Sequence, residues 1–203
     1  MLCTIHHADG STRIVEAAIG TPLPELIGAD LGAHGLDGEA RAVLIGGYHG
    51  TWIPAVRAAE LTLDNASMTA AGGILGAGVI AALPANRCGL AETARVVRYL
   101  ALESAGQCGP CLNGLPRMAE GLAELAGPRP SPQVRANVER WAGLVTGRGA
   151  CSHPDGSARF VRSALAVFSA ELHRHQEGLC SAASQRPFLP LPAEVAVRDE
   201  DWS

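Results

Sequence analysis

Two cysteines separated by two residues, Cys108 and Cys111, constrain this chain more than any other feature. A third cysteine, Cys151, follows after 39 intervening residues. This spacing is typical of a metal or iron–sulfur site, in which a close pair of thiolates holds one side of the centre and a distant cysteine closes the other. A fold that uses the site must therefore bring two distant segments together.

The cysteine pattern has one interruption. Ala105 stands where a further cysteine would complete a Cys-x-x-Cys-x-x-Cys run. A [4Fe–4S] cluster is usually bound by four thiolates, so the motif supplies three of them. The fourth iron would then take a ligand other than cysteine, or be missing as in a [3Fe–4S] centre.

Composition excludes several functions. The 203 residues carry a formal charge of −4, and the 16 basic residues are all arginine. No basic run with interleaved aromatic residues occurs, and aromatic residues make up 4% of the chain, so we expect no nucleic-acid partner. No Ser/His/Asp set or carboxylate pair indicates hydrolysis.

The sequence also gives expectations about location. We expect no signal peptide, because Met1 leads directly into a strand-like alternation. The longest apolar run, residues 74–83, is interrupted by glycine and too short to span a bilayer. We therefore expect a cytoplasmic protein that reaches the inner face of a membrane only through a partner. In such a compartment, clustered cysteines indicate metal or redox work.

The first part of the chain predicts a small α+β domain. Short strands are expected at 2–6, 12–17, 41–45, 51–53 and 61–63, with a short helix at 23–27. This order predicts a β-grasp (ubiquitin-like) domain over residues 1–66. Residues 67–88 read as a glycine-rich connector with a strand at 79–83, and its glycines fit no phosphate-binding motif.

The second part of the chain is helical. Helices are predicted from Gly89, over 111–126, from a cap at Ser131 to 146, and over 156–175 with a cap at Asp155. Four such helices with short connections predict an up-and-down four-helix bundle over 89–177, followed by a mobile Pro-rich tail at 178–203. In that bundle the loops that carry the three cysteines lie at the same end.

Several interpretations of the cysteines remain open at this point. His153 would complete a Cys₃His set for zinc. Cys-Gly-Pro-Cys also occurs in dithiol oxidoreductases, but the segment before it is helical where that fold needs a strand. Cys3 and Cys88 read as buried apolar residues, and Cys180 as an exposed thiol at the opposite end of the bundle. The histidines at 6, 7, 34 and 49 read as ordinary surface or core residues.

The motif at 103–111, ESAGQCGPC, resembles the Glu-Ser-Cys-Gly-x-Cys-x-Pro-Cys motif of the NADH-binding flavoprotein subunit of respiratory complex I and its hydrogenase and formate dehydrogenase relatives. Residues 20–26 resemble the helix start of that family's soluble-ligand-binding β-grasp domain, and 73–80 its glycine-rich strand. Residues 147–151 resemble the Gly-Arg/Lys-x-x-Cys segment that carries its last cluster ligand. The resemblance covers residues 1–175.

The resemblance implies an electron-transfer protein or subunit with one iron–sulfur cluster. The implied ligands are Cys108, Cys111 and Cys151, with Ala105 at the vacant position and water, hydroxide or His153 to fill it. We expect no FMN or NAD site, hence no hydride transfer by this chain alone, and a ferredoxin, flavoprotein or membrane reductase as partner. The alternatives are a docking module that lost the cluster or replaced it with zinc and, third, a thiol oxidoreductase.

Overall fold

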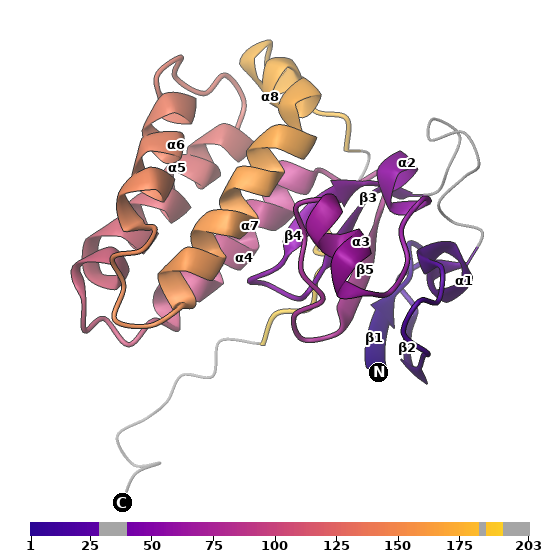
Figure 1. Ribbon diagram of the computed structural model, residues 1–203. Helices are drawn as coiled ribbons and strands as arrows, with labels where there is room; N and C mark the ends of the chain where they lie inside the picture. The colour runs from indigo at the N-terminus through magenta and orange to yellow at the C-terminus, as the bar shows by residue number, and fades with distance from the viewer. Residues whose placement is uncertain (29–39, 183–185, 193–203) are drawn as a thin grey trace, which may run out of the picture.

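The computed structural model describes residues 1–28, 40–182 and 186–192, and has a mixed α+β fold (Figure 1). Within these residues, five strands form one mixed sheet and eight α-helices and one π-helix surround it. The predicted α+β class is confirmed. His34 and residues 183–185 and 193–203 of the predicted tail lie outside the described residues.

The sheet has the strand order β2-β1-β5-β3-β4. Its strands are β1 (Leu2–His6), β2 (Thr12–Glu16), β3 (Ala40–Ile45), β4 (Thr51–Pro54) and β5 (Val79–Pro84). β1 and β5 pair in parallel, and the other neighbours pair antiparallel. The strand that the sequence placed in a connector is therefore the central strand of the sheet.

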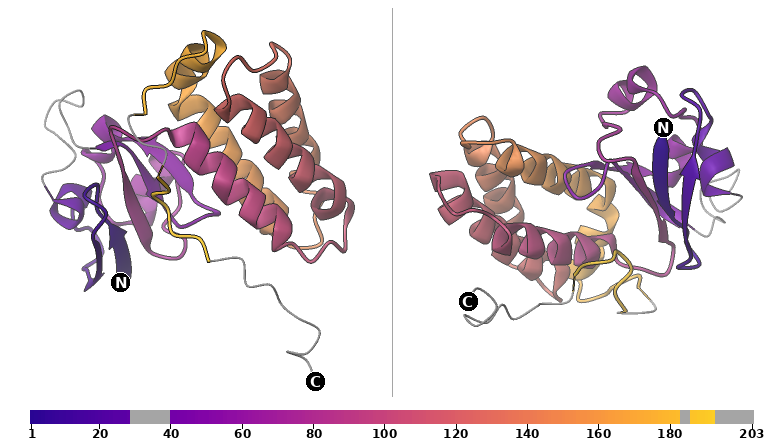
Figure 2. Two further views of the ribbon diagram at one scale, coloured as in Figure 1. Left: turned by 180° about the vertical axis from the view of Figure 1, so that it is seen from behind. Right: turned by 90° about the horizontal axis from the view of Figure 1, so that it is seen from below.

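The helices fall into two groups. Three short helices follow or precede strands, and five longer ones form a separate helical region with the π-helix (Figures 1 and 2). In chain order they are α1 (Leu23–Ile27), α2 (Ala55–Ala58), α3 (Asn65–Ala70), α4 (Gly89–Leu102), the π-helix η2 (Pro110–Gly114), α5 (Leu115–Ala126), α6 (Val134–Val145), α7 (His153–Val167) and α8 (Ser169–Gln176). α5 and α7 each contact both α4 and α6.

Both faces of the central strands β3 and β5 are buried. On β3, Leu44 faces the core formed with the helical region, whereas Val43 faces the core formed with α1, α2 and α3. On β5, Leu83 and Ala82 divide in the same way. Because successive side chains of a strand point to opposite faces, the two central strands contribute to two cores at once.

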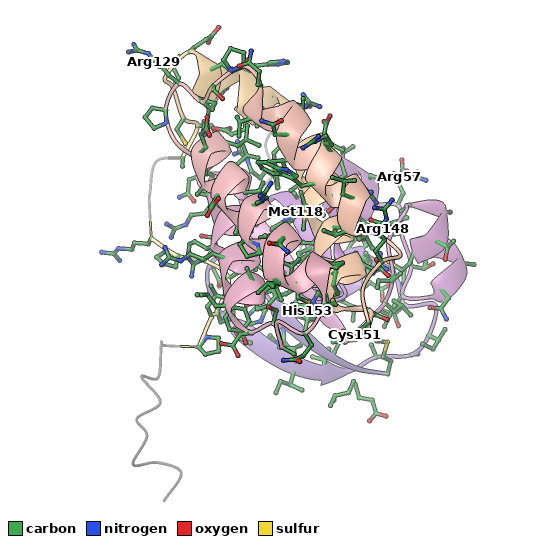
Figure 3. The ribbon with its side chains drawn as sticks, turned by 90° about the vertical axis from the view of Figure 1, so that its left-hand side faces the viewer. Arg57, Met118, Arg129, Arg148, Cys151 and His153 are labelled. Carbon is green, nitrogen blue, oxygen red and sulfur yellow. The ribbon has the colours of Figure 1, made fainter. Side chains whose placement is uncertain are left out.

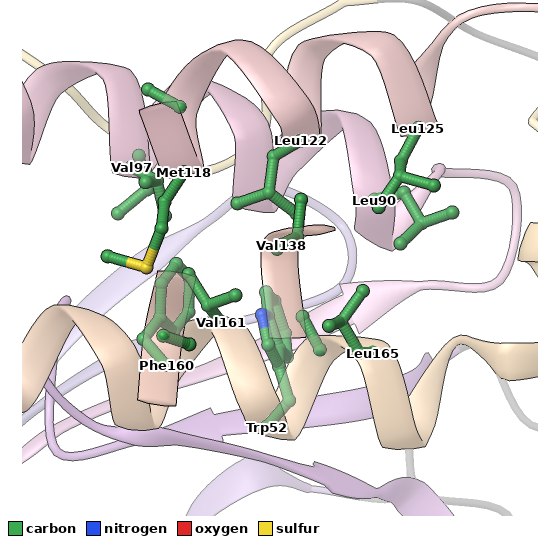
Figure 4. Packing of buried hydrophobic residues seen from close by; sticks show 14 of the residues in the cluster. Trp52, Leu90, Val97, Met118, Leu122, Leu125, Val138, Phe160, Val161 and Leu165 are labelled. Carbon is green, nitrogen blue, oxygen red and sulfur yellow. The ribbon is translucent and has the colours of Figure 1, made fainter. Parts of the chain in front are cut away.

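Trp52 of β4 joins the sheet to the helical region (Figure 4). Its ring stacks on Phe160, with 6.0 Å between ring centroids, and meets Phe168 edge-on at 5.3 Å. Its Nε1–H donates to Oγ1 of Thr93 at 3.0 Å, so the one polar group of this buried side chain is satisfied. These contacts hold α4 and α7 against the sheet.

Three details of the sequence prediction are corrected. The strand expected at 61–63 is only an isolated bridge between Pro22 and Thr62. The last predicted helix is two helices, because α7 ends at Val167 and α8 begins at Ser169, with Phe168 between them. Asp155 does not cap this helix from outside: it lies in the first turn of α7, and its Oδ1 accepts from Gly147 N at 2.7 Å.

Candidate metal centre

The close cysteine pair lies where α4 turns into α5. After α4 ends at Leu102, Gly106 adopts φ 63, a conformation that glycine reaches without strain, and redirects the chain. The π-helix η2 then begins beside Cys108 and continues directly into α5. Such single-turn π-helices occur frequently at functional sites. Cys111 is buried and Cys108 is half-buried.

Cys151 lies between α6 and α7, at the end of the helical region shown in Figure 3. Gly147 with φ 70 ends α6, and its N–H is held by the carboxylate of Asp155. The thiol of Cys151 is exposed. η2 packs against both α6 and α7, so the two cysteine-bearing segments lie at the same end of the helices.

Cys111 responds to both of the other thiols, and Cys108 to the backbone around it. Hydrogen bonds from the backbone N–H groups of Ala150 and Cys111 lower the pKa of the Cys108 thiol. Burial raises the pKa of Cys111, and the neighbouring Cys108 and Cys151 raise it further. Backbone N–H groups aimed at sulfur favour a thiolate, which is the form that binds metal. The structure thus brings the three predicted ligands together, while their role as ligands stays a prediction.

The vacant position has no side-chain donor of its own, and its neighbour Ser104 and the predicted ligand His153 both make hydrogen bonds elsewhere. The exposed Ala105 offers only a methyl group, and the hydroxyl of Ser104 donates to the carbonyl of Ala101 at 2.9 Å. Nε2 of His153 lies 2.8 Å from the carbonyl oxygen of Leu100, which makes it a donor there. In this conformation only Nδ1 of His153 could bind a metal.

His49 packs against this end of the helices. Its ring meets that of His153 edge-on, with 4.9 Å between centroids, and it covers Gly156 of α7. Burial lowers the pKa of His49, as do the nearby His153 and Arg159. A neutral imidazole at this position matches the expectation of an ordinary packed histidine.

A cavity of about 370 Å³ adjoins the cysteine motif. Gly109 and Pro110 form one side of it, and the side chains of Arg117, Arg140 and Arg148 line much of the remainder. The surface beside the predicted cluster is therefore cationic, although the chain as a whole carries a formal charge of −4.

Four further metal-binding side chains converge at the other end of the helical region: Cys88, Glu171, His175 and Cys180. From the sequence we predicted a buried Cys88 and an exposed Cys180, and both predictions of burial are confirmed. Their convergence was missed. The one local signal was the four-residue spacing of Glu171 and His175, which places both on one face of a helix.

No helix in the described part of the chain combines the length and the apolar character needed to cross a membrane.

Comparison with known proteins gives consistent matches. Residues 91–175 match the family model described as "NADH-ubiquinone oxidoreductase-F iron-sulfur binding region". An NADH-quinone oxidoreductase F protein of Rhizobium meliloti is 28% identical over 164 residues, which cover 81% of this chain and 39% of that protein. The NADH-quinone oxidoreductase F protein of Rickettsia bellii is 33% identical over 101 residues, covering 49% of this chain and 24% of the relative.

The fold is also found in a solved structure. A chain of an NAD⁺-reducing [NiFe]-hydrogenase in the air-oxidized state aligns with a TM-score of 0.66 at 18% identity. The alignment covers 95% of this chain and 31% of the hydrogenase chain. This chain thus spans less than half the length of the relatives it matches. The resemblance predicted from the cysteine motif is confirmed: residues 91–175 match the iron–sulfur binding region of NADH-quinone oxidoreductase F-like proteins.

Proposed function

We propose that this chain is an electron-transfer protein or subunit carrying one iron–sulfur cluster, bound by Cys108, Cys111 and Cys151. The observation that carries the proposal is the meeting of these thiols at one end of the helices, within the segment that matches an iron–sulfur binding region. A cluster at this position would supply one-electron chemistry. The residues of the chain hold it and set its electrostatic surroundings.

The donor set fits a cluster better than a single ion. Within residues 1–28, 40–182 and 186–192, the three motif thiols do not form a group close enough to share one ion. The group that does is the separate one of Cys88, Glu171, His175 and Cys180. Ligands of a cluster bind different iron atoms and so lie farther apart than ligands of one ion. Backbone N–H groups directed at the sulfur of Cys108 stabilise negative charge there, as hydrogen bonds to cluster sulfurs do.

We propose that the fourth position takes water or hydroxide, or is absent as in a [3Fe–4S] centre. The support is that the exposed Ala105 offers no donor and that the hydroxyl of Ser104 bonds to the carbonyl of Ala101; Nδ1 of His153 is the alternative ligand. A centre with one thiolate fewer carries less negative charge. We therefore expect a higher reduction potential than that of an otherwise similar four-cysteine cluster.

The fold supports the same proposal. We assign the sheet, with a helix after its first hairpin and parallel pairing of β1 with the central β5, to a β-grasp unit. We assign α4, α5, α6 and α7 to an up-and-down four-helix bundle, since each contacts two of the others. The flavin and nicotinamide chemistry of NADH-linked relatives would then come from a partner protein. The cationic cavity beside the motif suits an acidic surface on that partner.

Anaerobic reconstitution of the full chain with iron and sulfide tests the proposal. We expect bound iron and acid-labile sulfide, a broad visible absorption, and an EPR signal in one oxidation state. Cys111→Ser should abolish these properties, whereas Cys3→Ser, in the other core, should leave them intact. A wild-type protein that folds but binds no iron or sulfide would contradict the proposal, and bound zinc that Cys111→Ser removes would favour the docking-module alternative.

Ala105→Cys tests the vacant position. If the geometry of the family motif is retained, a fourth thiolate should make the cluster more resistant to oxygen and lower its potential. An unchanged half-life in air and an unchanged potential would show that residue 105 does not face the cluster.

A further inference from the structure

A second group of metal-binding side chains lies at the end of the helical region away from the three cysteines of the motif. We call Cys88, Glu171, His175 and Cys180 the α8 cluster. One donor atom from each of the four lies within 4.8 Å of every other. Arg129, whose backbone N–H bonds to the carbonyl of His175 at 2.7 Å, marks this end in Figure 3, opposite the labelled Cys151.

Three separate segments build the α8 cluster. Cys88 is the N-cap of α4, and its sulfur accepts from Ala91 N at 3.4 Å. Glu171 and His175 lie one turn apart on α8. Gly178, with φ 79, reverses the chain after α8 and so brings Cys180 back to the cluster.

The distances suit a single ion. Nε2 of His175 lies 3.6 Å from Sγ of Cys88 and 3.4 Å from Oε1 of Glu171. Tetrahedral zinc, with Zn–S of about 2.3 Å and Zn–N or Zn–O of about 2.0–2.2 Å, separates its ligand atoms by roughly 3.3–3.8 Å. The donors therefore need only small adjustments to surround an ion.

The donors are also oriented. Nδ1 of His175 lies 2.8 Å from the carbonyl oxygen of Leu125, so it carries the proton and leaves the lone pair of Nε2 directed into the cluster. A backbone carbonyl in this role is a common outer partner of a metal-binding histidine. Oε1 of Glu171 accepts from Ser181 N at 2.7 Å, which fixes the carboxylate.

The charges favour a cation. Cys88, Glu171 and His175 are nearly inaccessible to solvent, so a carboxylate or thiolate there needs an opposite charge close by. Oε2 of Glu171 lies 3.4 Å from Nη1 of Arg41, an ion pair that already places one positive charge beside the α8 cluster. Two thiolates and one carboxylate bring three negative charges, which a divalent ion and Arg41 would balance.

We propose that the α8 cluster binds one divalent metal ion, with zinc as the ion that best matches two thiolates, an imidazole and a carboxylate. A cavity of about 130 Å³ lined by Cys88, His175 and Cys180 gives access, and the exposed Cys180 is its outermost ligand. The ion fastens α8 and the segment after it to the start of α4.

Titration with Co²⁺ tests this site separately from the iron–sulfur cluster. The full chain carrying Cys108→Ser, Cys111→Ser and Cys151→Ser is stripped with a chelator and its fold checked by circular dichroism. We expect one equivalent of Co²⁺ to produce thiolate charge-transfer bands and the visible bands of a tetrahedral ion, both removed by Zn²⁺. Because the motif cysteines are absent, this result does not depend on the proposed function.

Cys180→Ser and His175→Gln in that background should each weaken Co²⁺ binding by more than the roughly 10–100-fold that loss of an outer partner costs. Cys3→Ser serves as the matched control and should change nothing. Since Cys180 is exposed, its substitution should leave the fold intact. Absence of Co²⁺ binding in the folded protein, binding indifferent to Cys180→Ser, or a Cys88–Cys180 disulfide that persists in reductant would each overturn the proposal.

Discussion

Replacing Gly121 of α5 and replacing Gly143 of α6 by alanine should change the stability of the protein in opposite directions. A Cβ on Gly121 would lie 2.5 Å from Cγ2 of Val138 and 3.0 Å from the ring of Trp141. A Cβ on Gly143 would meet nothing within 4 Å. Both residues lie inside helices, so Ala in place of Gly brings a similar gain in helix propensity at both positions, up to about 1 kcal/mol.

The difference comes from the packing of α5 on α6. Val138 is fully buried and β-branched, so its side chain has few other rotamers. Overpacking of this kind costs about 1–3 kcal/mol, and the 2.5 Å approach places Gly121→Ala in the upper half of that range. The net expectation is a loss of about 1–2 kcal/mol for Gly121→Ala and a gain of about 0.5–1 kcal/mol for Gly143→Ala.

Urea unfolding followed by circular dichroism measures both variants, and thermal melting should show shifts of about 2–4 °C per kcal/mol in opposite directions. Val138→Ala removes the methyl group that Gly121→Ala would strike, so the double variant should lose less stability than the sum of the two single variants. If Gly121→Ala stabilises the protein as much as Gly143→Ala does, the close packing of α5 on α6 is refuted.

Three further predictions concern other parts of the molecule. Glu92→Ala removes the acceptor of the backbone N–H of the buried Leu189, at 2.8 Å, and should cost about 1–3 kcal/mol by urea unfolding while exposing residues 186–192 to proteolysis. Asp64 caps α3 by accepting from Ser67 N, and this bond lowers the pKa of the Asp64 carboxyl group. The cap therefore stabilises the fold fully above the unfolded pKa, which is near 4, and this stabilisation is lost as pH falls through the lower folded pKa. Asp64→Asn should flatten the acid side of the curve of stability against pH. Arg148→Glu, beside the predicted cluster, should slow oxidation of the reconstituted protein by ferricyanide several-fold at low salt.

Each of these has its own control. Glu139→Ala, on an exposed helical pair, should be almost neutral, and equal losses from both glutamates would contradict the role of Glu92. An unchanged acid limb for Asp64→Asn would refute the cap. Oxidation by the cationic hexaammineruthenium(III) should not slow in Arg148→Glu, and a parallel fall in both rates would indicate damage to the cluster rather than a change in surface charge.

Local sequence signals predicted much of the helical region and the expected place of the cysteines. Helical periodicity and the Gly/Pro breaks after Ala126 and Thr146 gave the order of helices, and that order alone brought Cys151 to the end where Cys108 lies. The interruption at Phe168 was hidden, because apolar residues continue at helical spacing through it. The Phe168 ring packs against Gly89, and nothing in the sequence around Phe168 indicates this tertiary contact.

Features that depend on distant pairing were missed for the same reason. β5 resembles a short connector strand by itself, and only its pairing with β1 and β3 makes it central. Cys88 and Cys180 are 92 positions apart, and neither has a neighbour in sequence that indicates the other. A pattern search over neighbouring residues finds the motif at 108–111 and cannot find a ligand set assembled from three separate segments.

The burial of both faces of the central strands has a consequence for how this protein can vary. Adjacent residues of β5, Ala82 and Leu83, belong to different cores, so a shift of the strand by one position would exchange their surroundings and disturb both cores together. If either the helical region or the group of α1, α2 and α3 were removed, one apolar face of the central strands would be exposed to water. The core that includes the helices of the cysteine motif and the core formed with α1, α2 and α3 thus depend on a single strand register, and mutations that loosen one core should loosen the other.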